Sequence, residues 1–138
     1  GSEMCIRDRF LDVSGRPHDF REKKALWPAV IANDGFDTAF RIRPDAHKNG
    51  LPIAVLRDEE SNTQLSIFSD RNALVIYTMD DIPSNLFFER DRGQTALPRE
   101  AIAMEAQTLP DAINHAEFGD ITILPNEKKT YRISYHYN

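Results

Sequence analysis

The chain has few of the residues that build disulfide-linked, metal-bound or membrane-spanning proteins. Its 138 residues include one cysteine, so a disulfide within the chain and a cysteine-rich metal site are both excluded. No apolar run approaches the roughly 20 residues that a membrane-spanning helix needs. Nothing near the start resembles a secretory signal with an apolar middle. These absences favour a reducing, cytoplasmic setting.

Positive charge is also scarce. Lysine and arginine number 17 against 22 acidic residues, which leaves a net charge of -5. Proteins that bind nucleic acid normally carry a basic surface, so this class of partner is not expected. The length and the 41% of hydrophobic residues predict one domain with a core of its own.

Residues 1–9 read GSEMCIRDR and follow neither a helical nor a strand period. The string looks like a cloning remnant or sequencing read-through rather than native protein. We therefore expect a non-native leader at 1–9, outside the fold, and a domain at 10–138.

Short alternating segments separated by turn residues run through the rest of the chain. This succession predicts an all-β protein with an antiparallel β-sandwich. A helix within 22–32 is limited by Pro28 to a turn or two. Residues 44–50 are expected as a polar loop, and 79–98 as a long loop that covers one end of the sheet. The expected strands are 10–13, 36–42, 52–56, 64–68, 73–78, 102–107, 121–124 and 131–137, the last with one face buried.

The most informative stretch is 102–115, IAMEAQTLPDAINH. Its first half alternates, so Glu105 and Gln107 project from the same face of a strand. Pro110 and Asp111 then end the strand. A carboxylate at a strand end beside a loop is suited to act as a general base, although a single glutamate on a strand is more often just solvated.

Two other acidic features have structural alternatives. Asp37 follows Gly35 at the start of an expected strand, where an aspartate commonly caps the strand after a turn. The acidic loop 79–98 lacks the Asp-x-Asp-x-Asp-Gly spacing of a calcium loop. The sequence therefore predicts no metal site.

The run from Met104 to His115 resembles the C-terminal signature of the aldose 1-epimerase (galactose mutarotase) family, in which Glu-x-Gln precedes Pro-Asp-x-x-Asn. The Gly-Phe-Asp ending at Asp37 is similar to the family's Gly-hydrophobic-Asp, and Tyr77-Thr78 to its aromatic-Thr pair. Val75 stands where many members have Gln. The resemblance covers nearly all of 10–138 and corresponds to the C-terminal part of a longer fold, which implies a partial galactose mutarotase-like sandwich.

The resemblance implies a reaction. Members of the family interconvert the α and β anomers of a free hexose such as galactose or glucose, with a base at the anomeric hydroxyl, an acid at the ring oxygen and no cofactor. Glu105 would be the base. Asp37 would accept hydrogen bonds from sugar hydroxyls, and Gln107 would support the site from the same strand face.

The resemblance also implies that part of the site is missing. The family's acid is a histidine in its N-terminal portion, and none of His18, His47, His115 and His136 is its counterpart. We therefore expect half an active site for a monosaccharide, and self-association through open sheet edges. The alternatives are a non-catalytic carbohydrate-binding β-sandwich and a structural or interaction domain.

Overall fold

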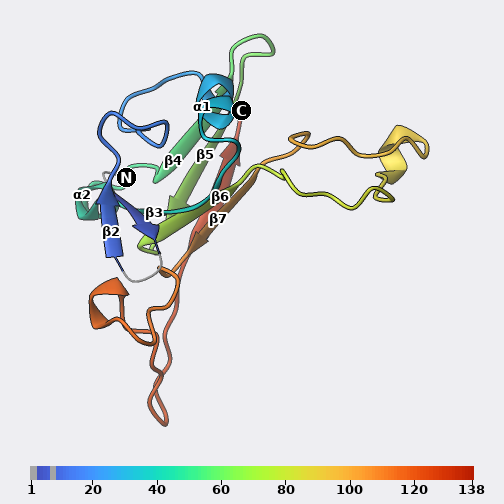
Figure 1. Cartoon of the computed structure of the whole chain (residues 1–138). Coiled ribbons are helices and arrows are strands. Elements are labelled where there is room, and N and C mark those ends of the chain that lie inside the picture. The colour runs from blue at the N-terminus through green and yellow to red at the C-terminus, as the bar shows by residue number, and fades with distance from the viewer. Residues whose placement is uncertain (1–2, 7–8) are drawn as a thin grey trace.

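The structure is a computed structural model that describes residues 3–6 and 9–138, and it contains two antiparallel sheets (Figure 1). In spatial order, the larger sheet consists of β2 (Arg9–Asp12), β1 (Glu3–Ile6), β3 (Asp37–Arg41), β6 (Ala73–Tyr77) and β7 (Ala103–Gln107). The smaller sheet consists of β4 (Ala54–Asp58), β5 (Thr63–Ser69) and β8 (Ile133–Tyr137). The predicted antiparallel β-sandwich is confirmed, and its open sheets make it a partial one.

The helices are short. They are α1 (Leu26–Ala32), α2 (Pro44–Lys48) and two 3₁₀ turns, η1 (Glu89–Asp91) and η2 (Ala116–Phe118). α1 has the predicted length of about two turns. Pro28 lies in its first turn, where the missing N–H would have had no partner within the helix. In the described part of the chain, no helix has both the length and the apolar character needed to cross a bilayer.

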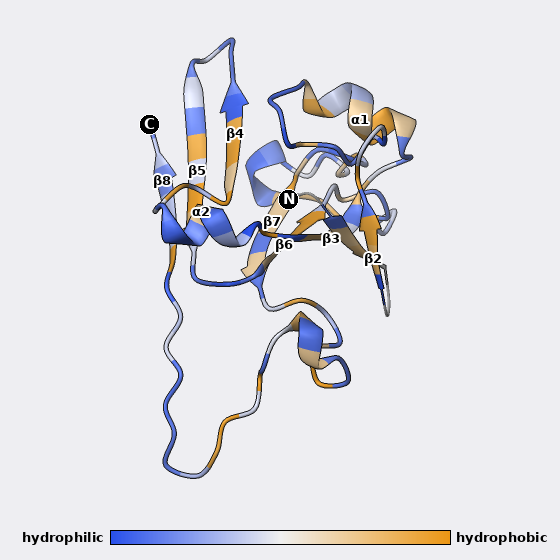
Figure 2. Cartoon of the chain, turned by 90° about the vertical axis from the view of Figure 1, so that its left-hand side faces the viewer, coloured by the Kyte–Doolittle hydropathy of each residue, from blue (hydrophilic) through white to orange (hydrophobic). Residues whose placement is uncertain are grey.

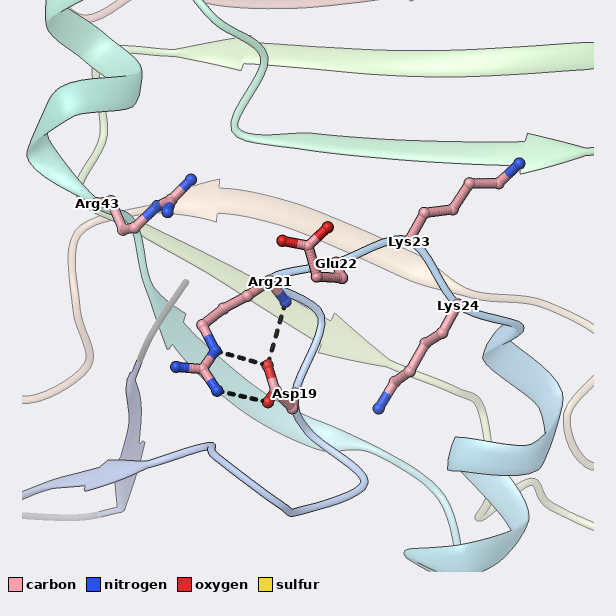
Figure 3. Close-up of a pocket in the computed structure, with 6 residues that line it drawn as sticks. All are labelled: Asp19, Arg21, Glu22, Lys23, Lys24 and Arg43. Atoms are coloured by element: carbon pink, nitrogen blue, oxygen red, sulfur yellow. Dashed lines mark hydrogen bonds and ion pairs between the residues drawn. The ribbon is translucent and has the colours of Figure 1, made fainter.

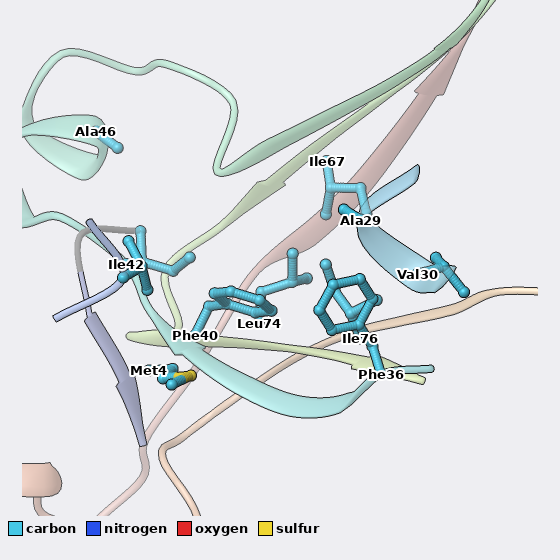
Figure 4. Packing of buried hydrophobic residues seen from close by; sticks show 11 residues of the cluster. Met4, Ala29, Val30, Phe36, Phe40, Ile42, Ala46, Ile67, Leu74 and Ile76 are labelled. Atoms are coloured by element: carbon cyan, nitrogen blue, oxygen red, sulfur yellow. The ribbon is translucent and has the colours of Figure 1, made fainter. Parts of the chain in front are cut away.

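The core lies between α1, one face of the larger sheet and β5 (Figure 4). Phe40 on β3 and Leu74 on β6 point into it, as expected from the strand period of two. Ile67 on β5 is completely buried and joins the two sheets. Burial of each such side chain contributes about 1.5–3 kcal/mol. The buried members of this cluster are Met4, Val13, Ala29, Val30, Phe36, Phe40, Ile42, Ala46, Ile67, Leu74 and Ile76.

The opposite face of the larger sheet is covered at one end only. Leu109, Ala112 and Phe118, from the segment after β7, pack there against Ala73 of β6. Phe10 of β2 joins the same cluster, and its ring centroid lies 4.9 Å from that of Phe118. The other end of this face is left open, and it is the end that carries the candidate site.

The expectation that residues 1–9 stand outside the fold was wrong for the residues that the structure describes. Glu3–Ile6 pairs with both β2 and β3, and Met4 is buried in the core. Hydrogen bonding to β3 makes this segment a strand, although its sequence has no strand period. Residues 1, 2, 7 and 8 lie outside the described residues, and the origin of the segment stays a hypothesis.

Four other expectations were wrong. Residues 44–50 begin with α2, because Pro44 is tolerated in the first turn of a helix and Ala46 can be buried beneath it. Residues 121–124 form no strand. The loop after β6 extends away from the sheets, with its own bridge between Phe87 and Thr95 (Figure 1). β8 is exposed at all five positions, because the core packs against Ile67 of β5 and does not extend over either face of β8.

The segment between η2 and β8 forms a second projecting arm, which carries apolar stretches well away from the core (Figure 2). Ile123 and Leu124 are more than 60% exposed in it. The arm is held by an ion pair of 2.8 Å between Lys129 Nζ and Asp120 Oδ2. Lys129, together with backbone hydrogen bonding by Thr122, lowers the pKa of Asp120 to about 2.

Asn72, just before β6, connects the segment after β7 to the sheet. Its side-chain amide donates to Phe118 O at 2.7 Å and accepts from Leu109 N at 3.1 Å. Gly119 has φ +118, and a Cβ there would lie 3.0 Å from Asn72 Nδ2. The glycine therefore allows both the backbone conformation and the close approach.

We predict that Asn72→Ala lowers the free energy of unfolding by about 1–3 kcal/mol, because it leaves a half-buried N–H and a carbonyl without partners. Urea denaturation measures this change. The exposed Asn85→Ala is the matched control, with an expected change within about 0.5 kcal/mol. Equal effects of the two variants would contradict the anchoring role of Asn72.

Candidate functional site

Glu105 lies at the middle of β7, on the open face of the larger sheet. It is exposed, whereas its neighbour Met104 packs against the core on the opposite face. Val75 of β6 stands directly across from Glu105. Gln107 lies two residues further on the same face, half-buried and opposite Ala73. The predicted shared orientation of Glu105 and Gln107 is confirmed by this register.

Asp37 is the first residue of β3 and lies on the same face. Its cross-strand partner is Tyr77 of β6, whose other cross-strand partner is Ala103 of β7. Asp37 and Glu105 are therefore separated by one strand and offset by two residues. Ordinary strand spacing puts their Cα atoms roughly 10 Å apart across the strands and roughly 7 Å along them.

The turn before Asp37 is fixed by Thr78, which is buried. The Thr78 hydroxyl accepts from Phe36 N at 2.7 Å, and Thr78 N donates to Phe36 O at 2.9 Å. Thr78 also donates to Asp80 Oδ2 at 2.6 Å. In the aromatic-Thr pair noted in the sequence, Thr78 therefore has a structural role, because it positions the start of β3.

Arg99 completes this anchor from the far end of the long loop. Its guanidinium donates to Asp80 at 2.6 Å and to Asp34 at 2.8 Å. Gly35 has φ +94, and a Cβ at this position would overlap the Asp80 carboxylate, so glycine is required. Burial alone would raise the pKa of Asp80, but hydrogen bonds from Thr78 and Arg99 outweigh it and lower the pKa.

The second half of the 102–115 signature has a structural part. Asp111 adopts a left-handed conformation with φ 62, and its carbonyl accepts from Asn114 N at 3.0 Å. Leu109 is 2% exposed beneath the sheet face. These residues turn the chain under the sheet at the end that carries Ala73 and the half-buried Gln107, and they leave Glu105 exposed.

The four histidines are engaged with other groups. His18 packs against Phe36 and Phe40, and burial lowers its pKa, helped by Arg16 and Lys24 nearby. His47 Nδ1 lies 2.8 Å from Ser69 O, so it is not merely solvated. His115 stacks on Phe118, and His136 lies against Phe68. Within the described residues, none of the four is hydrogen-bonded or ion-paired to Glu105.

The larger cavities lie elsewhere. One of about 730 Å³ opens between the smaller sheet and the segment before α1, on the core side of the sheet. Another, of about 620 Å³, is lined by charged residues (Figure 3). There the Arg21 guanidinium donates two hydrogen bonds to Asp19 and lowers the pKa of that carboxyl to about 2. Lys23 and Lys24 point away from each other, so the cations do not converge on one anion.

Metal ligands do not gather in the part of the chain that the structure describes. No group of three or more His, Cys, Asp or Glu side chains in it could hold a metal ion. The open face instead offers two carboxylates, a carboxamide and a phenol. All four groups form hydrogen bonds to hydroxyls, and the two carboxylates can also accept a proton.

Comparison with known proteins extends this picture. The family model for aldose 1-epimerase matches residues 2–136. An aldose 1-epimerase from Streptococcus thermophilus is 46% identical over 136 residues, 99% of this chain and 39% of its own length. A maltose epimerase from Levilactobacillus brevis is 40% identical over 132 residues, 92% of this chain and 36% of its own.

A solved structure agrees on the fold. The crystal structure of a GalM/aldose epimerase homologue from C. elegans superimposes with a TM-score of 0.82 at 20% identity, over 99% of this chain and 43% of that one. The fold therefore defines a β-sandwich of the galactose mutarotase type. The chain belongs to the aldose 1-epimerase family. It spans about two fifths of the length of these relatives.

Sequence reasoning missed the residues that hold the site in place. Asn72 and Arg99 lie in segments without periodicity, and their partners are 19 to 65 residues away. A polar residue at a strand start was the available signal for Asn72. The sequence carried no signal for Arg99, because the contact between the end of the long loop and Asp80 at its start is visible only in the folded structure.

We predict that Asp80→Asn lowers the free energy of unfolding at pH 7 by about 1.5–3 kcal/mol, the usual value of hydrogen bonds to a charged group. Because folding lowers the pKa of Asp80, its contribution is present above its ordinary value of about 3.9 and is lost as the pH falls through the folded value. When the pH is lowered from about 4.5 to about 2.5, the free energy of unfolding should therefore fall less in Asp80→Asn than in the wild type.

Chemical denaturation at a series of pH values tests this. Asp81→Asn is the control, because among the described residues the Asp81 side chain has no hydrogen bond or ion pair with Arg99, and the variant should keep the wild-type slope against pH. A wild-type slope for Asp80→Asn would show that the anchor around Arg99 does not depend on ionised Asp80.

Proposed function

We propose that this chain carries the base-bearing half of an aldose 1-epimerase site, which acts on a free hexose such as galactose or glucose. The observation that supports it is the exposed Glu105 on the same sheet face as Asp37, one strand away. Relatives named aldose 1-epimerase and maltose epimerase support the reaction class. The single cysteine supports a cytoplasmic setting.

In the proposed mechanism, Glu105 removes the proton from the anomeric hydroxyl while an acid protonates the ring oxygen. The C1–O5 bond breaks, the C1–C2 bond rotates, and the ring closes on the other face of the aldehyde with the proton transfers reversed. Asp37 accepts hydrogen bonds from sugar hydroxyls and orients the ring. Gln107 lies beside Glu105 and can hydrogen-bond to the sugar or to the base.

The acid is the missing component. Each of the four histidines is packed or hydrogen-bonded away from Glu105. A base without its acid forfeits about 10²–10⁴-fold of proton-transfer assistance. The proposal is therefore that this chain alone is a weak catalyst.

A second candidate is a non-catalytic carbohydrate-binding sandwich. Val75, which faces Glu105 directly, favours it, because an apolar neighbour offers the reaction neither a proton nor a hydrogen bond. The two candidates differ in what they require of Glu105. A binding protein needs a hydrogen-bond acceptor at this position, whereas an epimerase needs a group that accepts a proton.

We predict that the chain, added to freshly dissolved α-D-galactose, accelerates the change in optical rotation only weakly. Glu105→Gln should abolish this acceleration and spare sugar binding observed by NMR, because an amide keeps the shape of the side chain but accepts no proton. Glu60→Gln, on an exposed turn, is the control and should behave as the wild type.

The outcomes separate the candidates. Turnover at the level of full-length relatives would refute the half-site proposal. Binding without any acceleration, unchanged in Glu105→Gln, would favour the carbohydrate-binding protein.

Self-association through exposed sheet edges is part of the proposal, with a second copy of the chain as the partner. β7 and β8 each have one edge that no described strand covers. Tyr135 and Tyr137 on β8 are 54% and 75% exposed. An uncovered strand with apolar side chains is a template for further pairing.

We predict that the apparent mass in size exclusion with light scattering rises with protein concentration. Tyr135→Lys should reduce this rise, since a charge on an edge strand opposes pairing. Glu60→Gln, on the exposed turn between β4 and β5, changes the net charge by the same single unit and serves as the control. A mass that stays at one chain at all concentrations would refute the proposed association.

A further inference from the structure

β6 presents an apolar lane on the open sheet face. Val75 and Tyr77 project toward the open part of this face, whereas Ala73 lies under Leu109 and Phe118 at its covered end. Leu74 and Ile76 point into the core. The strands on either side carry the acidic residues: Asp37 stands opposite Tyr77 on β3, and Glu105 stands opposite Val75 on β7. The candidate site is therefore a hydrophobic strip with a carboxylate on each side.

The Tyr77 ring is held close to Asp37. Because Thr78 N donates to Phe36 O, the next pair along the ladder, Asp37 and Tyr77, is the non-hydrogen-bonded type, with Cα atoms about 4.5 Å apart and side chains closest. The Tyr77 hydroxyl donates to Asp81 O at 3.3 Å, which restrains the ring.

The ring retains a free surface. Its partner on the other side is Ala103, whose methyl group is too small to cover an aromatic ring. Tyr77 is accordingly half-buried.

A pyranose, like this sheet face, has separate polar and apolar surfaces. Hydroxyl groups surround its rim, whereas ring C–H groups give it at least one apolar side. An aromatic ring combines a large apolar surface with a negative face that attracts C–H groups. Two carboxylates that lie two strand spacings apart, roughly 10 Å, and two residues apart along the strands, roughly 7 Å, can accept hydroxyl hydrogens from opposite sides of a ring lying between them.

We propose that Tyr77, with Val75 beside it, is the floor on which the sugar ring lies, and that Tyr77 thereby determines which sugars bind. This inference rests on the proposed function, since it places the substrate of the same site. It assigns the C–H side of the pyranose to β6 and the hydroxyl rim to Asp37 and Glu105. Sugars with an unbroken C–H side, such as galactose with its C3, C4 and C5 hydrogens together, are preferred.

Saturation-transfer NMR on the full chain with methyl β-D-galactopyranoside tests this arrangement. The strongest transfer is expected at the ring C3–C5 protons. Tyr77→Ala should weaken binding by about three- to tenfold, the usual range for an aromatic contact. Tyr77→Phe, which keeps the ring and loses only the hydroxyl, should restore wild-type binding. Tyr137→Ala, on the exposed edge strand, is the matched control.

The outcomes distinguish this inference from the proposed function. If Tyr77→Ala binds the galactoside with wild-type affinity and an unchanged melting temperature, the proposed role of Tyr77 as the floor is refuted. The proposed role of Glu105 is then unaffected. Weakened binding in Tyr77→Ala together with unchanged acceleration in Glu105→Gln would support the floor and overturn the proposed base. No transfer to any galactoside proton in the wild type would overturn the floor.

Discussion

β6 is the strand on which the rest of the structure depends. It forms ladders with β3 on one side and β7 on the other. Because successive side chains alternate between faces, one side of β6 buries Leu74 and Ile76, and the other supports the open face. A slip of one residue in either ladder would send Asp37 or Glu105 toward the core, at the cost of burying a charge. The hydrophobic core and the arrangement of the candidate site are thus set by one register.

Two polar anchors hold that register at opposite ends of β6. At one end, Asn72 joins the start of the strand to the segment after β7. At the other, Thr78 and Asp80 join its end to the turn before β3, with Arg99 bridging from the long loop. Each anchor combines hydrogen bonds with a glycine that leaves space for them. The proposed site is therefore built on strands with fixed ends, and of the long loop after β6 only the base, with Asp81 and Arg99, contributes to its geometry.

The regular strands could be predicted from the sequence, because their alternation reflects a buried and an exposed face. Residues 36–42 and 73–78 contain β3 and β6 almost as expected. The expectations failed where tertiary contacts decide the outcome. Glu3–Ile6 has no recognisable period, but it gains order by pairing with two strands. β8 has a clear alternation, but it lies at an edge where neither face is covered.

In the candidate site, too, some features could be predicted from the sequence and others depend on tertiary contacts. Alternation alone put Glu105 and Gln107 on one face of a strand, and resemblance to the family supplied their expected roles together with that of Asp37. The anchors around Asn72 and Arg99 could not be inferred, because their partners are distant along the chain. The Tyr77 lane between the carboxylates likewise depends on strand order, which local sequence does not encode.

The sequence by itself determined the strand periods, the turn chemistry and the family, because these follow from side-chain alternation, backbone preferences and a long ordered motif. The tertiary structure decided which strands are neighbours and which edges stay open. It also decided that Asp37, Tyr77 and Glu105 share one surface. These features depend on contacts between residues far apart in the chain, and the free energy of those contacts becomes available only when the two sheets form together.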